Sequence, residues 1–404
     1  MNFRMEKYKV ILLLFSLLPM FYQFFSLENY FINVLRYTPL FLIIVTVGIF
    51  RPFSLKVNKE SLLLIIPVTL NYLVVPLISF NIGNYDVKLE LFNIFLYLIS
   101  LVAIVMVVSY VENVNTFLKL VKYTLVTNSL VLTVVIIINF KQLLDARNYM
   151  WLVSERAERA SYGFIHPNTA GVFLFTELVL LLLCLIIYKK KRLIIPVIFY
   201  FICLLATGSR TALICIVIML GIYYVVKFLN KINNKLQVVV ASSIFILIFV
   251  FLIDYNWGGF WANTSKRDYY YMHNIKYLLD SGYILFGIGP VNNTSMSLAN
   301  PNILITDNWY LGNTILYGVI GTLIFISFLG AIFAKFINII NSNDRSKKKL
   351  ITLWGVSLLV SFCVYSFFET ILYVPGISLS IIFWTLILSI IKINRAKFIK
   401  RRVL

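Results

Sequence analysis

Long apolar runs separated by short polar segments fill the chain from end to end. Most runs are roughly 18–23 residues long, the length that an α-helix needs to cross a bilayer. A membrane barrel would show short segments of alternating hydrophobicity instead. We therefore predict an all-α integral membrane protein of about twelve transmembrane helices, with residues 1–404 as a single polytopic domain. The predicted spans are 10–27, 31–50, 61–80, 91–111, 121–140, 169–188, 193–208, 211–228, 236–253, 309–334, 350–372 and 376–391.

Composition agrees with this pattern. Of the 404 residues, 61% are hydrophobic and 13% are charged, whereas a soluble domain has about 25% charged residues. No small-residue cleavage site follows the first span, so we expect a retained helix rather than a removed signal peptide. The four cysteines, Cys184, Cys203, Cys215 and Cys363, lie inside predicted spans. We interpret them as small buried hydrophobic residues rather than disulfides or metal ligands.

Lysine and arginine are distributed unevenly between alternate loops. With the N-terminus in the cytoplasm, the cytoplasmic segments hold 26 of the 36 Lys and Arg residues. This asymmetry follows the positive-inside rule and, with an even number of spans, predicts that both termini are cytoplasmic. It also accounts for the net charge of +20 without a nucleic-acid partner. The basic residues are spread over short loops, where they set topology and meet anionic lipid.

Two predicted outer loops, 141–168 and 254–308, are much longer than the others and contain both histidines. Long polar loops in a compact membrane protein are usually functional. The alternative is solvated linker, but Trp151, Trp257, Trp261 and the tyrosines of 269–271 argue against it. Such aromatic residues form an interfacial belt or stack on sugar rings.

Arg210 is the one charge in the stretch LLATGSRTALI. The spans on either side both reach cytoplasmic basic clusters at their far ends, so the turn at Gly208 and Ser209 faces outward and Arg210 opens a span. Two interpretations remain open. The side chain is a snorkelling anchor, or it forms an anion site with the free amides of the helix start.

Other outer arginines are candidates of the same kind. Arg156 and Arg159 lie in SERAERAS, which is either a solvated helix with local ion pairs or part of an anion site. Arg267 begins a stretch with helical apolar spacing at Met272, Ile275, Leu278 and Leu279. We predict a helix on the bilayer surface, with Lys266, Arg267, His273 and Lys276 meeting anionic headgroups.

Three carboxylates and one histidine complete the candidate chemistry. Asp307 precedes a span, either as an N-cap or as a general base. Glu177 and Glu369 lie inside predicted spans, where an acid is expensive and therefore a functional candidate. Glu369 is better placed, near an outer helix end. His166 in FIHPNTAG is a functional candidate or an ordinary loop residue, and Asn308 and Tyr310 share the segment of Asp307.

In their order along the chain, these motifs resemble the O-antigen ligase/polymerase superfamily, which contains Wzy-type polysaccharide polymerases and WaaL-type ligases. The resemblance covers roughly residues 160–325. Its motifs are HPN at 166–168, TGSRTAL at 207–213, FGIGP at 286–290 and DNWYLGNTILYGVIG at 307–321. Ligase-like members usually have His-Asn where this chain has Asp307-Asn308, which weakens a ligase assignment.

The resemblance implies a glycosyltransferase on the outer face of the cytoplasmic membrane. Such an enzyme joins undecaprenyl-diphosphate-linked oligosaccharides to a hydroxyl of a second lipid-linked molecule, as in capsule, exopolysaccharide or O-antigen synthesis. It requires no metal or other cofactor. Its partners are the lipid-linked donor and acceptor, the bilayer, a flippase and a chain-length regulator.

On this basis Arg210 and Arg267 are expected to bind the donor diphosphate. Arg156 and Arg159 are expected to bind the second diphosphate. Asp307 or Glu369 is expected to activate the acceptor hydroxyl.

Three alternatives remain. A ligase of the same superfamily would transfer a finished glycan to a different acceptor. A flippase or other transporter would not be an enzyme, and internal repeats and broken helices are typical of that class. A membrane scaffold without a ligand is the third, which the long outer loops disfavour.

Overall fold

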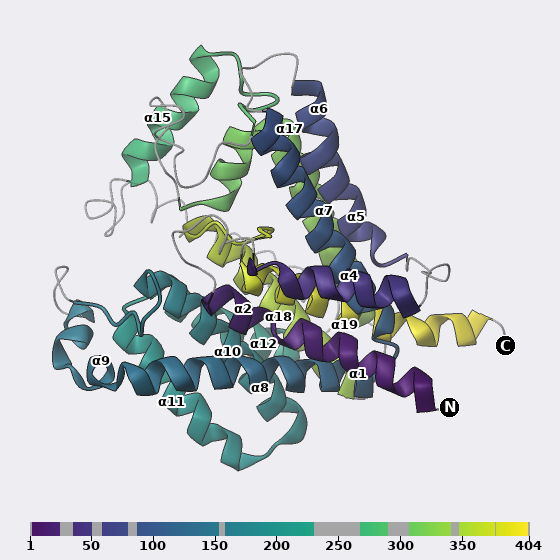
Figure 1. Cartoon of the computed structure of the whole chain (residues 1–404), viewed down its shortest axis with the longest axis vertical. Helices are drawn as coiled ribbons and strands as arrows, with labels where there is room; N and C mark the ends of the chain where they lie inside the picture. Colours follow the sequence, from purple (N-terminus) through teal and green to yellow (C-terminus); the bar gives the residue numbers. More distant parts are fainter. Residues whose placement is uncertain are drawn as a thin grey trace.

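The computed structural model describes residues 2–24, 35–50, 59–79, 87–152, 158–229, 267–289, 307–340, 347–375 and 377–402 (Figure 1). Throughout these residues the regular structure is helical, without strands. The helices are α1 (Asn2–Ser16), α2 (Leu18–Phe24), α4 (Thr38–Phe50), α5 (Leu62–Thr69), α6 (Val75–Ser79), α7 (Val87–Tyr110), α8 (Val114–Ile138), α9 (Phe140–Leu144), α10 (Pro167–Tyr188), α11 (Ile194–Thr207), α12 (Arg210–Leu229), α15 (Arg267–Asp280), α17 (Trp309–Ile340), α18 (Lys347–Phe368) and α19 (Ser378–Arg402). A π-helical turn, η1 (Leu70–Val74), joins α5 to α6, and two 3-10 turns are η2 (Ala146–Leu152) and η3 (Lys191–Leu193).

The all-helical class that the sequence predicts is confirmed for the described residues. Every predicted span overlaps a described helix or helix pair except 236–253, which lies outside the described residues. Five helices, α8, α10, α12, α17 and α18, are long and apolar enough to cross a membrane. In Figure 1 the start of α1 and the end of α19 lie on the same side of the molecule.

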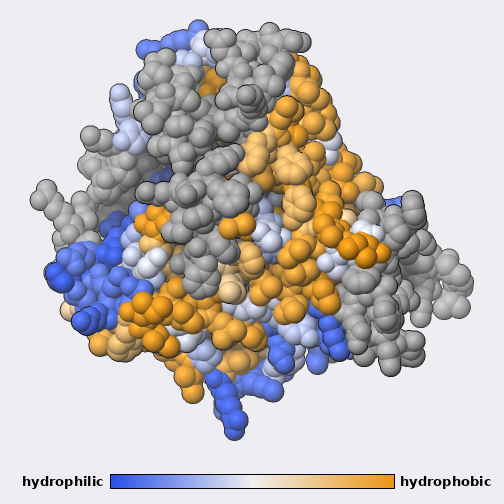
Figure 2. All heavy atoms as spheres, viewed as in Figure 1, coloured by the Kyte–Doolittle hydropathy of each residue, from blue (hydrophilic) through white to orange (hydrophobic). Residues whose placement is uncertain are grey.

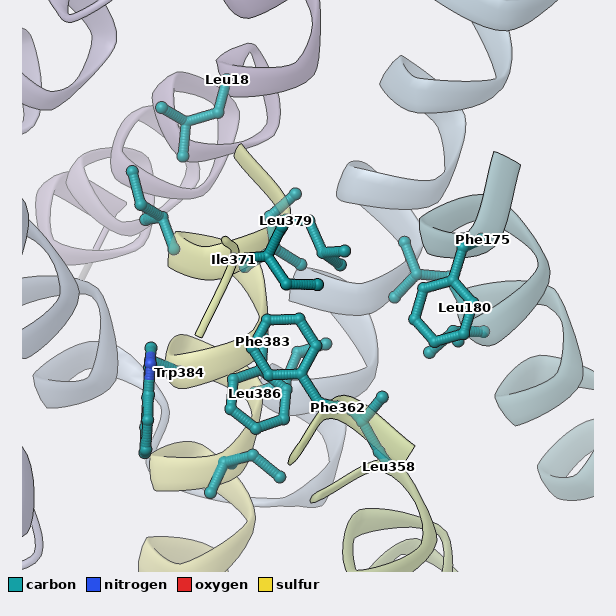
Figure 3. Close-up of a cluster of buried hydrophobic side chains, with 14 of the residues drawn as sticks. Leu18, Phe175, Leu180, Leu358, Phe362, Ile371, Leu379, Phe383, Trp384 and Leu386 are labelled. Carbon is teal, nitrogen blue, oxygen red and sulfur yellow. The ribbon is translucent and has the colours of Figure 1, made fainter. Parts of the chain in front are cut away.

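Burial distinguishes central helices from peripheral ones. The apolar window of α10 is 89% buried and that of α18 is 78% buried, against 39% for α8 and 33% for α12. Figure 3 shows part of the core to which α10, α18 and α19 contribute, where the rings of Phe362 from α18 and Phe383 from α19 stack at 3.8 Å between centroids. Three of the four cysteines are buried, as the sequence predicts, whereas Cys363 is half-buried, and all four are free thiols.

Large apolar side chains also cover much of the outside (Figure 2). On the peripheral helices, Ile138 of α8, Ile195 of α11 and Val217 of α12 are each at least 66% exposed. Exposed apolar area on this scale is unfavourable in water and is expected of helices that contact lipid. The hydrophilic residues visible in this view gather toward the margins of the molecule.

Helix α17 is broken at Gly318, whose backbone (φ 71°, ψ 179°) is not helical. The break disrupts the regular helical hydrogen bonding, and the segment that follows α15 supplies partners. The carbonyls of Ile315 and Leu316 accept hydrogen bonds from the amides of Ile288 and Gly289, at 2.8 and 2.9 Å. In return, the amides of Val319 and Ile320 donate to the carbonyls of residues 284 and 285, at 2.9 and 3.2 Å. We call these paired segments, 284–289 and 315–320, the backbone clamp.

Two glycines make the clamp possible. A Cβ at Gly318 would collide with the backbone of Leu285, and a Cβ at Gly287 would collide with the backbone of Leu316. The FGIGP and YGVIG motifs, about thirty residues apart in the sequence, are therefore two sides of one contact. The clamp fixes α15 to α17, where Leu278 and Ile315 form a small buried cluster.

Candidate functional site

The TGSR turn between α11 and α12 agrees with the sequence prediction for Arg210. Gly208 ends α11 with a left-handed backbone (φ 59°), and Arg210 is the first residue of α12, half-buried. Ser209 is buried against α10, where a Cβ on Gly171 would meet its side chain at 2.5 Å. The turn is thus seated on the start of α10, which limits where the Arg210 guanidinium can lie.

A second arginine is held at the same helix ends. Arg159 is half-buried, and its Nε donates a hydrogen bond to the carbonyl of Thr207 at 2.9 Å. Its Nη2 donates to Oδ1 of Asn168 at 2.6 Å. Next to it, the amide of Ala160 donates to the carbonyl of Ala206 at 3.0 Å. These bonds tie the loop before α10 to the end of α11.

The loop that carries Arg159 is itself well anchored. Oε1 of Gln142 accepts hydrogen bonds from the amides of Ser161 and Tyr162, at 3.0 and 2.8 Å. The buried Tyr162 hydroxyl donates to the carbonyl of Cys203 at 3.1 Å. An ordered loop is what a binding site needs, because a fixed guanidinium loses little conformational entropy when an anion binds.

The start of α10 connects this arginine to a carboxylate. His166 is the N-cap, and its Nδ1 accepts the amide proton of Asn168 at 3.1 Å. The side chain of Asn168 in turn donates from Nδ2 to Oε1 of Glu369, at 2.8 Å. Glu369 follows the end of α18, 201 residues further along the chain. An unbroken series of hydrogen bonds therefore runs from Arg159 through Asn168 to Glu369.

Electrostatic interactions show which other charges lie near this series. Burial lowers the pKa of Arg159, the Glu369 carboxylate raises it and the Arg210 guanidinium lowers it further. Burial also lowers the pKa of His166, with Arg159 contributing in the same direction and Asp307 opposing it. We call Arg159, His166, Arg210, Asp307 and Glu369 the charge cluster. The cluster contains two guanidiniums, an imidazole and two carboxylates, each of which interacts electrostatically with at least one other member.

Such a cluster can bind an anion and accept a proton at the same place. Guanidiniums present planar donors that match phosphate oxygens, whereas the first amides of α10 already donate to His166. Because Nδ1 of His166 accepts an amide proton, the neutral ring carries its own proton on Nε2 and acts as a hydrogen-bond donor there. The carboxylates are then the proton acceptors of the cluster.

Two of the sequence-predicted residues have packing roles outside the charge cluster. Asn308, not Asp307, caps α17, because its Oδ1 accepts the amide proton of Leu311 at 3.1 Å. The N-cap interpretation of Asp307 is therefore wrong. The Tyr310 hydroxyl donates to the carbonyl of Cys363 at 3.1 Å, and its ring lies against Phe367. Both residues fix the start of α17 against its surroundings.

The candidates of α15 are described only in part. Arg267 is the first residue of this helix, but its side chain lies outside the described part of the structure, and Arg156 and Lys266 lie outside it altogether. His273 stacks on Tyr269, with 6.0 Å between ring centroids. The face turned inward carries Tyr271, Asn274 and Leu278, whereas Met272 and Leu279 are exposed. The predicted apolar face is therefore split between an inward and an outward side.

Glu177 lies apart from the charge cluster. It is fully buried on α10, where Nδ2 of Asn128 donates to its Oε2 at 2.9 Å and the Ser129 hydroxyl bonds to its Oε1. Its partners are uncharged and its surroundings are core, so packing explains it better than catalysis. Asn168, in contrast, is a site residue that motif reasoning missed. It is the last residue of the HPN motif at 166–168, but it was not singled out as a candidate.

The lowered pKa of His166 gives a testable pH dependence. The unfolded chain binds a proton at His166 below about pH 6.5, whereas the folded chain resists it. The protein should therefore lose stability as the pH falls through this range. His166→Asn keeps a capping side chain but removes the titration. Thermal unfolding of purified protein between pH 5 and 7.5 should show a smaller loss for this variant, and equal slopes would contradict the assignment.

The electrostatic interactions thus connect five sequence-predicted candidates, Arg159, His166, Arg210, Asp307 and Glu369, within one cluster. Comparison of the sequence with protein-family models and with curated proteins gave no match.

Proposed function

We propose that this protein is a membrane glycosyltransferase that polymerises a cell-surface polysaccharide. Its substrates are undecaprenyl-diphosphate-linked oligosaccharides on the outer face of the cytoplasmic membrane, and its twelve spans place both termini inside. The observation that carries the proposal is the charge cluster, where Arg159 interacts electrostatically with both Arg210 and Glu369 at the ends of apolar helices. A lipid-linked diphosphate needs this combination of fixed cations and adjacent hydrocarbon.

The proposed glycosyl transfer uses the carboxylates and guanidiniums of the charge cluster. The acceptor hydroxyl attacks the anomeric carbon of the donor, its proton passes to Asp307 or Glu369, and the new glycosidic bond forms. The bond from the anomeric carbon to the diphosphate oxygen breaks, and its electron pair leaves with the diphosphate. Arg159 and Arg210 stabilise the charge that develops there. A direct displacement inverts the anomeric centre, and Arg267 is proposed to contact the same lipid-linked substrates.

Arg210→Lys tests the proposal. Lysine keeps the positive charge but lacks the planar fork of donors, so polymer yield in cells should fall about 10- to 100-fold while the protein still inserts. Arg147→Lys is the matched control, because Arg147 is exposed and paired with Asp145 and Glu158, outside the charge cluster. Normal polymer from Arg210→Lys, at equal protein level, would contradict the function.

Product analysis separates the polymerase from the ligase alternative. Loss of a polymerase leaves single repeat units on their lipid carrier. Loss of a ligase leaves long chains that are not attached to their acceptor. Asp307, where ligase-like members usually have His, favours the polymerase.

A transporter is the second candidate, and the break of α17 at Gly318 favours it. Broken helices are typical of substrate sites in transporters. In this protein the π-helical turn η1 lies beside the broken helix α17. Asn71 of η1 is hydrogen-bonded to Asn313 of α17, which is bonded in turn to Thr322 on the other side of the break, and all three side chains are uncharged. Loss of a flippase would leave repeat units in the cytoplasmic leaflet, where external periodate does not reach them, whereas loss of the polymerase leaves them accessible.

A further inference from the structure

Asn168 lies between a cation and an anion. Its Oδ1 accepts a hydrogen bond from Nη2 of Arg159 at 2.6 Å, and its Nδ2 donates to Oε1 of Glu369 at 2.8 Å. Within the described part of the chain, no ion pair joins Arg159 directly to Glu369. The amide thus connects the two charges and also keeps them apart.

An amide suits this position because it presents an acceptor and a donor on one short side chain. An aspartate would accept from the guanidinium but would repel the carboxylate of Glu369. An apolar residue would release both groups. In a partly buried site they would then attract each other strongly, and a bidentate pair would form. That pair would occupy the donors and lone pairs that a substrate needs.

The bridge is preorganised by its surroundings. Pro167 opens α10, and the His166 ring caps the amide of Asn168, so the backbone at this position is fixed. On the other side, the carbonyl of Thr207 holds Nε of Arg159. With these two bonds made, Nη1 of Arg159 has no protein partner in the described residues. Nη1 can therefore donate hydrogen bonds to a bound anion.

We infer that Asn168 is a positioning residue that holds Arg159 and Glu369 as separate charges, with Arg159 directed to the diphosphate of a lipid-linked substrate. The inference rests on the proposed function and adds to it the residue that keeps the site open. Asn168 acts through its two neighbours and need not touch the substrate.

Binding of undecaprenyl diphosphate to the protein in nanodiscs tests the inference. Asn168→Ala should weaken binding about tenfold, the effect of about 1.4 kcal/mol, because Arg159 collapses onto Glu369. Adding Asn168→Ala to Arg159→Ala should weaken binding little further, since the group that Asn168 positions is already gone. Asn168→Asp should also weaken binding. The pair Asn168→Asp with Glu369→Gln should restore it, because the carboxylate then accepts from both the guanidinium and the new amide.

Parallel measurements separate the possible failures. Arg147→Ala should bind like the unmodified protein. If Arg159→Ala and Arg210→Ala also bind normally, the proposed function fails. If these two lose binding and Asn168→Ala does not, only the inference about Asn168 fails. Additive losses for Asn168→Ala and Arg159→Ala, together with a lower unfolding temperature, would mean that Asn168 merely stabilises the fold and would overturn the inference.

Discussion

Replacing Gly318 by alanine should destabilise the protein by about 3 kcal/mol or more. Two penalties combine. The backbone of Gly318 (φ 71°, ψ 179°) lies in a region that essentially only glycine occupies. The new methyl group would also strike the backbone of Leu285, which cannot move without breaking the clamp. Thermal unfolding in detergent measures the effect, and loss of polymer should accompany it.

Two other glycines provide matched controls. Gly330 lies on the same helix with open space at its Cβ position, so Gly330→Ala should be neutral or slightly stabilising. Gly282 has a positive φ of 75° but also open space, so Gly282→Ala measures the backbone strain alone, about 1 kcal/mol. If Gly318→Ala unfolds at the same temperature as Gly330→Ala, the clamp does not exist as described.

Asn313→Ala should cost about 2–3 kcal/mol. The Asn313 side chain lies in the core beside the break, where its Oδ1 accepts from Asn71 at 2.9 Å and its Nδ2 donates to Thr322 at 3.1 Å. The Tyr72 hydroxyl reaches the same Oδ1 at 3.4 Å. Alanine would leave the buried amide of Asn71 without this acceptor, and a buried polar group without a partner is unfavourable.

Ser327→Ala is the control for Asn313. Ser327 also lies on α17, but its hydroxyl bonds to the carbonyl of Leu323 in the same helix and is exposed. Its loss should change stability by less than about 0.5 kcal/mol. The thermal unfolding curves of the two variants should therefore separate clearly. Coincident curves would show that the polar contacts between η1 and α17 contribute nothing to the fold.

Together these variants examine how a broken helix is supported within an apolar bundle. The clamp satisfies the backbone groups at the break, and Asn313 connects the broken helix to the π-turn of its neighbour. Tyr72 of that turn stacks on Tyr97 at 3.8 Å and meets Tyr317 edge-on, so aromatic packing closes the space around the polar groups. The start of α17, which directly follows Asp307 and Asn308, is thereby held in a fixed position.

Much of the helical architecture follows from local sequence. A run of about twenty apolar residues forms a helix because its backbone must satisfy its own hydrogen bonds in hydrocarbon, and this requirement needs no knowledge of neighbours. All the predicted spans except 236–253, which lies outside the described residues, overlap described helices, and five of these helices are long and apolar enough to cross a membrane. The start of α12 at Arg210 was also predictable, because Gly208 and Ser209 mark a turn between two apolar runs.

Local sequence was less informative about residues whose structural partners lie far away along the chain. Gly318 lies in the DNWYLGNTILYGVIG motif, but nothing in that motif shows that the helix breaks there, because the segment that pairs with the break lies about thirty residues earlier. At the start of the same helix, Asp307 and Asn308 are both good capping residues. Only the backbone geometry showed that Asn308 makes the cap.

The charge cluster likewise depends partly on local sequence and partly on tertiary packing. The sequence by itself determined the helical class and the long apolar helices, and it predicted the topology and the candidate residues, because apolar length and charge asymmetry are properties of each segment. The tertiary structure alone decided that Arg159 and Glu369 meet through Asn168, with Arg210 beside them. The physical reason is that electrostatic and hydrogen-bond partners depend on which helix ends pack together. That packing is set by side-chain shape across the whole bundle, and no local pattern encodes it.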